Sequence, residues 1–215
     1  MSAKLILTER EDIDPFLTNM GLSHDGLVEV VRFAEAQRAL CTSNDVRGFN
    51  LITVHDKAAR GLREVFCGED WEKDETDNQA GIRNPKLKLR VIPCNFDENA
   101  GNLDARPTNR VLKGHATRRK VRCNRTGWLP NLPMPTPMPG KSDFTTWVLG
   151  IFAEDQKPLA AELSLPLGFN GGRYFDFVNR IILDLRGDPM TGSQRRQPDR
   201  GGPVEDIDIE IKRKV

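Results

Sequence analysis

Residues 144–167 read FTTWVLGIFAEDQKPLAAELSLPL, and this stretch decides the fold class. Two apolar segments, 144–153 and 158–167, flank the polar residues 154–157. A short polar connection between two apolar segments is typical of a hairpin loop between strands. We therefore expect two antiparallel strands in this part of the chain.

Three other segments can extend this sheet. Residues 174–185, YFDFVNRIILDL, fit a helix or a strand, because their apolar positions satisfy both periods. Residues 207–211 alternate isoleucine with acidic residues, which is the clearest strand pattern in the chain. Residues 87–91, LKLRV, predict a half-buried strand in which the apolar side chains alternate with Lys88 and Arg90.

The N-terminal part has helical periodicity instead. A helix is expected to begin after the N-cap Ser23 and to end at 44–48, where Asn, Asp and Gly accumulate. A second helix is expected at about 56–67, and 51–54 is either a short strand or its first turn. The predicted fold class is therefore α+β, with N-terminal helices and a mainly antiparallel sheet built largely from the C-terminal part.

A proline-rich segment separates these two parts. Five prolines within residues 129–142 exclude a helix or a central strand and favour an extended polyproline II conformation. We predict a mixed helical part at 1–128, a strap or linker at 129–142 and a β-rich part at 143–215. A single domain crossed by the strap is the alternative.

The charge of the chain is concentrated in one segment. The net charge is only +1, yet residues 106–125, RPTNRVLKGHATRRKVRCNR, contain no acid. Clustered positive charge on a protein is typical of a surface that contacts phosphate. The predicted nucleic-acid contacts are Arg106, Arg110, Lys113, His115, Arg118, Arg119, Lys120, Arg122 and Arg125.

The pattern allows two local conformations for this basic segment. Gly114 interrupts it, which favours a loop leading into a short strand at 120–123. In a helix, Arg118, Arg122 and Arg125 would instead share one face. Either geometry aligns cations along a line that can follow a phosphate backbone.

Two further charged regions bear on this interpretation. Residues 69–77 are expected to form an exposed acidic loop, which can pair with the basic segment and leave it no external ligand. The Gly- and Pro-rich residues 187–203 hold Arg195, Arg196 and Arg200, which we assign as an auxiliary phosphate clamp.

The hairpin also suggests a catalytic alternative. A metal-dependent nuclease of the D…E-x-K type uses two carboxylates to hold Mg²⁺ and a lysine beside the attacking water. Asp155 and Glu162 have the required spacing, but Ser164 stands where the lysine belongs. Mg²⁺ is expected only under this alternative; otherwise the sequence predicts no metal site and no cofactor.

Composition and sequence patterns narrow the classes of protein to which this chain can belong. The N-terminus does not resemble a signal peptide, no apolar stretch is long enough to span a membrane, and the four cysteines form no C-x-x-C pair. We therefore expect a cytoplasmic protein that binds DNA or RNA, as a subunit of a larger nucleoprotein complex. A nuclease or phosphodiesterase is the first alternative, and a scaffold subunit that binds a protein partner is the second.

Overall fold

The hairpin forms the centre of the structure. The computed structural model describes residues 5–127 and 144–186, in which β5 (Thr145–Phe152) pairs antiparallel with β6 (Ala160–Asn170). The ambiguous segment at 174–185 is a strand, β7 (Arg173–Ile182), which pairs antiparallel with β6. Its place in the sheet, where it pairs with β6 and buries aromatic and β-branched residues, decides between the two periodicities.

Strands from the N-terminal part complete a seven-stranded sheet in the order β1-β7-β6-β5-β4-β3-β2. The β1–β7 and β4–β5 pairs are parallel, and the other four pairs are antiparallel. The fold is therefore α+β, as expected. The N-terminal strands are β1 (Leu5–Leu7), β2 (Glu72–Asp74), β3 (Gly81–Asn84) and β4 (Leu89–Asn95).

Three helices precede most of the sheet: α1 (Arg10–Asn19), α2 (His24–Arg38) and α3 (Phe49–Phe66). The predicted cap is confirmed, since the Ser23 hydroxyl accepts a hydrogen bond from the Gly26 amide at 3.2 Å. The expected end of α2 at 44–48 is wrong, because the helix stops at Arg38. Residues 51–54 are helical, and Gly48 precedes α3 with φ 84°, a conformation that favours glycine.

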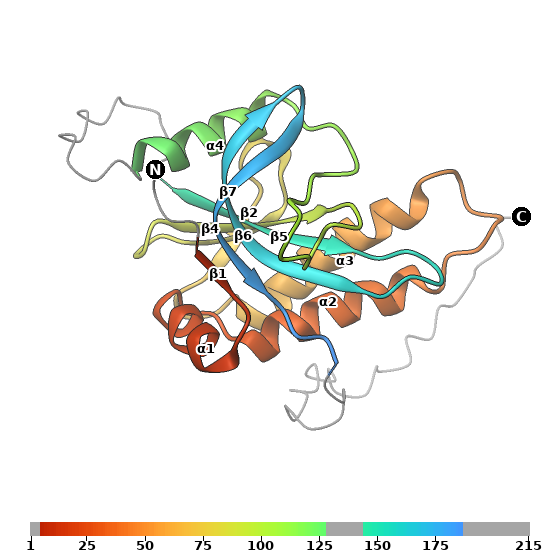
Figure 1. Cartoon of the computed structure of the whole chain (residues 1–215), viewed down its shortest axis with the longest axis horizontal. Helices are drawn as coiled ribbons and strands as arrows, with labels where there is room; N and C mark the ends of the chain where they lie inside the picture. Colours follow the sequence, from red (N-terminus) through yellow and green to blue (C-terminus); the bar gives the residue numbers. More distant parts are fainter. Residues whose placement is uncertain (1–4, 128–143, 187–215) are drawn as a thin grey trace, which may run out of the picture.

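The two faces of the sheet are covered differently. Figure 1 shows α1, α2 and α3 against one face and α4 (His115–Gly127) against the other. The face covered by α1, α2 and α3, which we call the helical side, buries a large apolar core that includes Leu27, Leu62 and Leu149. The α4 face has a smaller apolar cluster around Phe96 and Tyr174 and, in addition, several buried charged residues.

The expectation that 87–91 forms a half-buried strand with Arg90 on its exposed face is wrong. Strand β4 lies inside the sheet, between β3 and β5, and it is covered on both faces. Arg90 is consequently only 1% exposed, whereas Leu87 lies before the strand and is 47% exposed. Neighbouring strands and helices, and not the local alternation, determine which side chains are buried.

Several expectations concern residues outside the described ranges: the proline-rich segment at 129–142, the strand at 207–211, and Arg195, Arg196 and Arg200. The sheet nevertheless contains strands from both sides of the proline-rich segment, because β4 pairs with β5 over seven residues. Among the described residues, no helix has the length and apolar character needed to cross a membrane.

Candidate nucleic-acid interface

The second half of the basic segment folds as helix α4, so the expected strand at 120–123 is wrong. Buried residues recur at helical spacing along it, namely Thr117, Lys120, Val121 and Asn124. Only one of these four is aliphatic, which is why apolar periodicity alone did not indicate a helix. The helix contains no acidic residue.

Polar contacts attach α4 to the sheet. The Asn124 amide nitrogen donates to the carbonyl oxygens of Thr146 and Pro166, both at 2.9 Å, and its oxygen accepts from the Thr146 amide at 2.8 Å. Lys120 donates to the Thr76 carbonyl oxygen at 3.1 Å. These bonds fix both the rotation of α4 and its position over β5 and β6.

The opposite side of α4 faces solvent. His115, Arg118, Arg119 and Arg122 are all exposed, at positions i, i+3, i+4 and i+7, and we call these four residues the α4 stripe. The arginine side chains therefore extend from one face of a helix that is held rigidly on the sheet. Arg118 pairs with no other described side chain. The side chain of Arg125 lies outside the described part.

The acidic segment at 69–77 contacts this helix through Thr76 and Asp77. Asp77 accepts from Arg119 at 2.7 Å and from Lys120 at 3.2 Å. The segment is not simply an exposed loop, because 72–74 forms β2 and Asp74 is buried against Arg90. Arg119 and Asp77 keep 62% and 30% of their side chains exposed. An exposed ion pair of this kind contributes only about 0–1 kcal/mol, so a phosphate can replace Asp77.

Opposing effects set the protonation of this pair. Burial alone would raise the pKa of Asp77, but the hydrogen bonds and charges of Lys120 and Arg119 lower it below 3.8. Burial and the neighbouring Arg90 lower the pKa of Lys120 despite its contact with Asp77. The Asp77 carboxylate is therefore ionised at neutral pH and competes with any anion that approaches Arg119.

This arrangement predicts a pH-dependent effect of Asp77→Asn. A carboxyl whose pKa is lower in the folded state stabilises the protein above its unfolded pKa, near 3.8, and loses this effect as pH falls through the folded pKa. We expect the variant to be less stable at pH 7 by up to about 1 kcal/mol. The difference from wild type should shrink below pH 4, and urea unfolding across pH measures it. An equal difference at every pH would contradict the pairing.

The first half of the basic segment lies away from the α4 stripe, in the connection between β4 and α4. Arg106 lies 3.7 Å from Asp176, and Arg110 lies 3.9 Å from Glu154. The Lys113 backbone amide donates to the Gly172 carbonyl oxygen at 2.9 Å. The structure therefore brings four of the nine predicted contacts together on the exposed side of α4 and places these three elsewhere. Lys120 is buried on the other side of the helix, so its prediction as a surface contact is wrong.

The two carboxylates of the nuclease alternative point in different directions. Asp155 lies in the β5–β6 turn and accepts from Arg38 of α2 at 2.9 Å, on the helical side. Glu162 points to the opposite side of β6 from Ala161 and Leu163, which belong to the core beneath the helices. Both Glu162 oxygens bind Arg180, at 2.9 and 2.6 Å. Among the described residues, no group of three or more His, Cys, Asp or Glu side chains could hold a metal ion.

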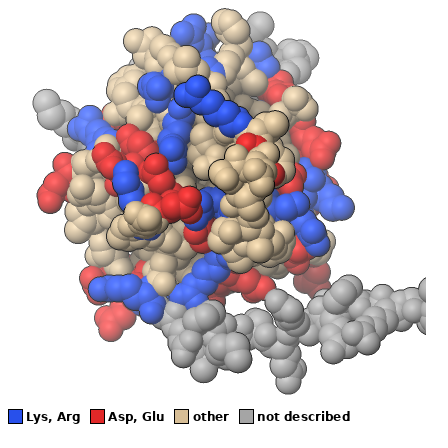
Figure 2. Space-filling view, turned by 90° about the vertical axis from the view of Figure 1, so that its right-hand side faces the viewer, with Lys and Arg blue, Asp and Glu red and all other residues tan. Residues whose placement is uncertain are grey.

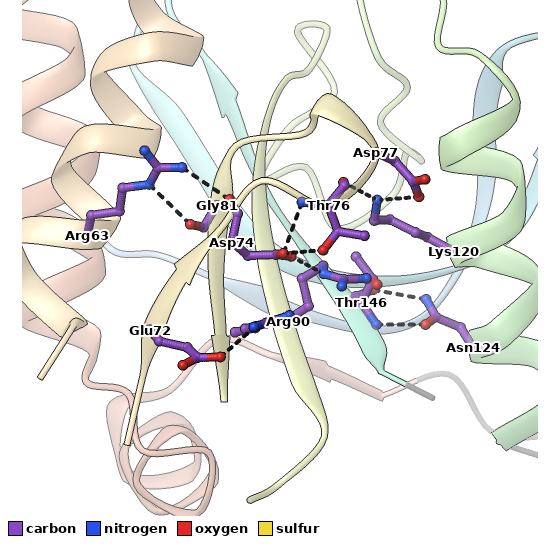
Figure 3. Close-up of polar contacts among 11 residues, drawn as sticks. Arg63, Glu72, Asp74, Thr76, Asp77, Gly81, Arg90, Lys120, Asn124 and Thr146 are labelled. Atoms are coloured by element: carbon purple, nitrogen blue, oxygen red, sulfur yellow. Dashed lines mark hydrogen bonds and ion pairs between the residues drawn. The ribbon is translucent and has the colours of Figure 1, made fainter. Parts of the chain in front are cut away.

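A polar cluster beside α4 was not expected from the sequence. Figure 3 shows Arg90 between Asp74 and Thr146, with Lys120 and Asn124 reaching in from α4. The Arg90 Nε donates to Asp74, but its two Nη atoms and the Thr146 Oγ1 are buried and have no hydrogen-bond partner among the described residues. A buried guanidinium nitrogen that lacks an acceptor is unusual in a folded protein.

An aromatic ring lies over this cluster. The Phe144 ring centroid is 5.1 Å from the Arg90 guanidinium carbon, 5.4 Å from the Lys88 Nζ and 5.9 Å from the Arg83 guanidinium carbon. We call these four residues the Phe144 cluster. The alternation of Lys88 with Arg90 was visible in the sequence, but nothing in the sequence indicated that Phe144 would join them.

Charge on another face of the molecule is mixed. Figure 2 shows the face at the right of Figure 1, where Lys and Arg side chains intermingle with Asp and Glu. The α4 stripe adds exposed cations on an acid-free helix, and the Phe144 cluster adds cations around an aromatic ring. The chain matches no protein-family model, no curated protein and no solved structure.

Proposed function

We propose that this protein binds nucleic acid, with the phosphate backbone lying along the α4 stripe. The observation that carries the proposal is an acid-free helix whose exposed face presents His115, Arg118, Arg119 and Arg122 in one line. Phosphate contacts dominate the affinity of proteins for nucleic acids, and arginine is well suited to make them.

The distribution of charge supports this proposal. Residues 101–127 contain eight Lys or Arg and a single acid, Asp104, in a chain whose net charge is +1. The buried polar contacts of Asn124 and Lys120 hold the helix in place, so its backbone does not have to be ordered when phosphate binds to the exposed side. Phosphate contacts of this kind carry no sequence preference, and they suit a subunit of a larger nucleoprotein complex.

Arg118→Ala/Arg119→Ala is the first test. If both arginines contact phosphate, the variant should bind duplex DNA more weakly, and the slope of log K against log salt should fall by about two units. Fluorescence anisotropy with labelled duplex DNA, single-stranded DNA and RNA, titrated over salt concentration, measures both quantities.

Arg47→Ala/Arg60→Ala is the matched control. It removes the same charge from exposed positions before and within α3, on the helical side of the sheet. The control should keep the wild-type slope. An equal loss in both double variants would indicate a general charge effect and contradict a contact through α4. If the wild-type protein binds none of the three nucleic acids at low salt, the proposal is wrong. Cleavage of the same samples after addition of Mg²⁺ would instead establish a nuclease.

A further inference from the structure

The Phe144 cluster lies on the same face of the sheet as α4. Arg83 pairs with Arg90, and Arg90 pairs with Thr146, so their side chains share one face. The Phe144 ring lies within 5.9 Å of Arg83, Lys88 and Arg90, which places it and Lys88 on the same side. Asn124 of α4 binds the Thr146 backbone directly, so the cluster adjoins the helix (Figure 3).

The ring has features of a stacking platform. Phe144 is partly exposed, and Lys88 beside it is exposed. Arg83 keeps 38% of its side chain exposed, although it pairs with Glu72 at 2.6 Å. An aromatic surface bordered by exposed cations matches the chemistry of a nucleotide, since the base stacks on the ring and the flanking phosphates meet the cations.

Arg90 adds positive charge beneath the ring. It is almost completely buried, and Asp74 is its one carboxylate partner among the described residues, while both Nη atoms lack acceptors. Lys120 is a second buried cation close to it, which the lowered pKa of Lys120 reflects. Two buried cations therefore lie beneath the ring, and positive charge at this place favours contact with a polyanion.

We propose that the Phe144 cluster is a base-stacking site for single-stranded nucleic acid. This inference rests on the proposed function and specifies its ligand. In a duplex both faces of an internal base are already stacked on neighbouring bases, so only an unpaired base can lie on the Phe144 ring. The strand would run from this ring toward α4, whose Asn124 contacts β5 two residues after Phe144.

The test compares Phe144→Ala with wild type on oligo-dT, oligo-U and a blunt duplex of the same length. Loss of one stacked base should weaken oligo-dT and oligo-U binding by roughly 5- to 150-fold and leave the salt slope unchanged. Duplex affinity should stay at the wild-type value. Stacking alone treats DNA and RNA similarly, so a difference between oligo-dT and oligo-U in wild-type affinity would indicate a further contact that distinguishes them.

Three further variants make the result interpretable. Phe144→Leu keeps apolar bulk over Arg90 but lacks an aromatic face, so it should lose single-strand affinity while its urea unfolding stays close to wild type. Phe144→Trp should retain binding and show fluorescence quenching by oligo-dT beyond that of wild type. Phe175→Ala removes a phenylalanine that is 54% exposed on β7 and should change nothing.

The outcomes distinguish the two proposals. If no nucleic acid binds to wild type, the proposed function and this inference both fail. Suppose that wild type binds, and that Phe144→Ala weakens the binding of duplex and single strand equally or weakens neither. The stacking site is then wrong, while phosphate binding along α4 stands. A selective loss for the single strands in Phe144→Ala and Phe144→Leu establishes the site.

Discussion

Glu162→Gln is expected to lower the free energy of unfolding by about 3–5 kcal/mol, because it breaks an ion pair that is buried on both sides. Glu162 is 0% exposed and Arg180 is 5% exposed. The carboxylate accepts from Arg180 twice, from the Ser164 hydroxyl at 2.5 Å and from the Gly101 amide at 2.9 Å. The neutral amide leaves the Arg180 charge without its counter-ion in the interior.

The loss should extend to the connection that leads into α4. Arg180 also donates to the Ala105 carbonyl oxygen at 2.8 Å, and Gly101 belongs to the same connection. Urea unfolding gives the stability, and hydrogen exchange of residues 97–114 should increase in the variant. Glu98→Gln, which changes a glutamate that is 70% exposed, is the matched control and should cost less than about 1 kcal/mol.

A double variant tests the pairing itself. In Glu162→Gln/Arg180→Met no unpaired charge remains, so the combined loss should be smaller than the sum of the two single losses. The same variant bears on the nuclease alternative. If Glu162→Gln unfolds like wild type and loses only a cleavage activity, Glu162 is a catalytic residue and its structural role is refuted.

Phe96→Ala is the second change with a large expected effect, also about 3–5 kcal/mol of unfolding free energy. Phe96 is 0% exposed, and its ring centroid lies 5.8 Å from that of Phe177 and 6.3 Å from that of Tyr174. These rings belong to the smaller apolar cluster, under α4, so truncation leaves a cavity in closely packed surroundings. Urea unfolding measures the loss, with the exposed Phe175→Ala as the control.

A substitution at Gly150 tests the packing of the Phe96 ring directly. A Cβ at Gly150 would lie 2.1 Å from the Phe96 ring carbons, so Gly150→Ala should also destabilise the protein. When Phe96 is already alanine, the same methyl group enters the space that the ring has left. The double variant should therefore lose less stability than the two single variants lose together. Strict additivity would mean that the ring does not rest on Gly150.

Local signals accounted for much of the fold. The hairpin at 144–167 and the cap at Ser23 were predicted correctly, because each depends on residues close together in the sequence. The period of 174–185 remained ambiguous, since the choice depends on pairing with β6. Contacts between distant segments lie beyond what periodicity can express.

The candidate site was harder to predict for the same reason. The charge of the basic segment is evident from the sequence, but its helix is hidden because Thr117, Lys120 and Asn124 replace apolar residues on the buried side. Arg90 looked like a surface residue and is buried, because β4 has neighbours on both edges and both faces. Phe144 meets Arg83 through register across three strands, which no local pattern encodes.

The order of the strands makes the two stretches of chain mutually dependent. The strands β5, β6 and β7 lie between β1 on one side and β4, β3 and β2 on the other, so the later stretch is enclosed by the earlier one. Residues 5–127 hold α1, α2, α3 and α4 but lack the middle of the sheet that these helices cover. A cut between Gly127 and Phe144 would leave two complementary pieces, each of which supplies the surface on which the other folds.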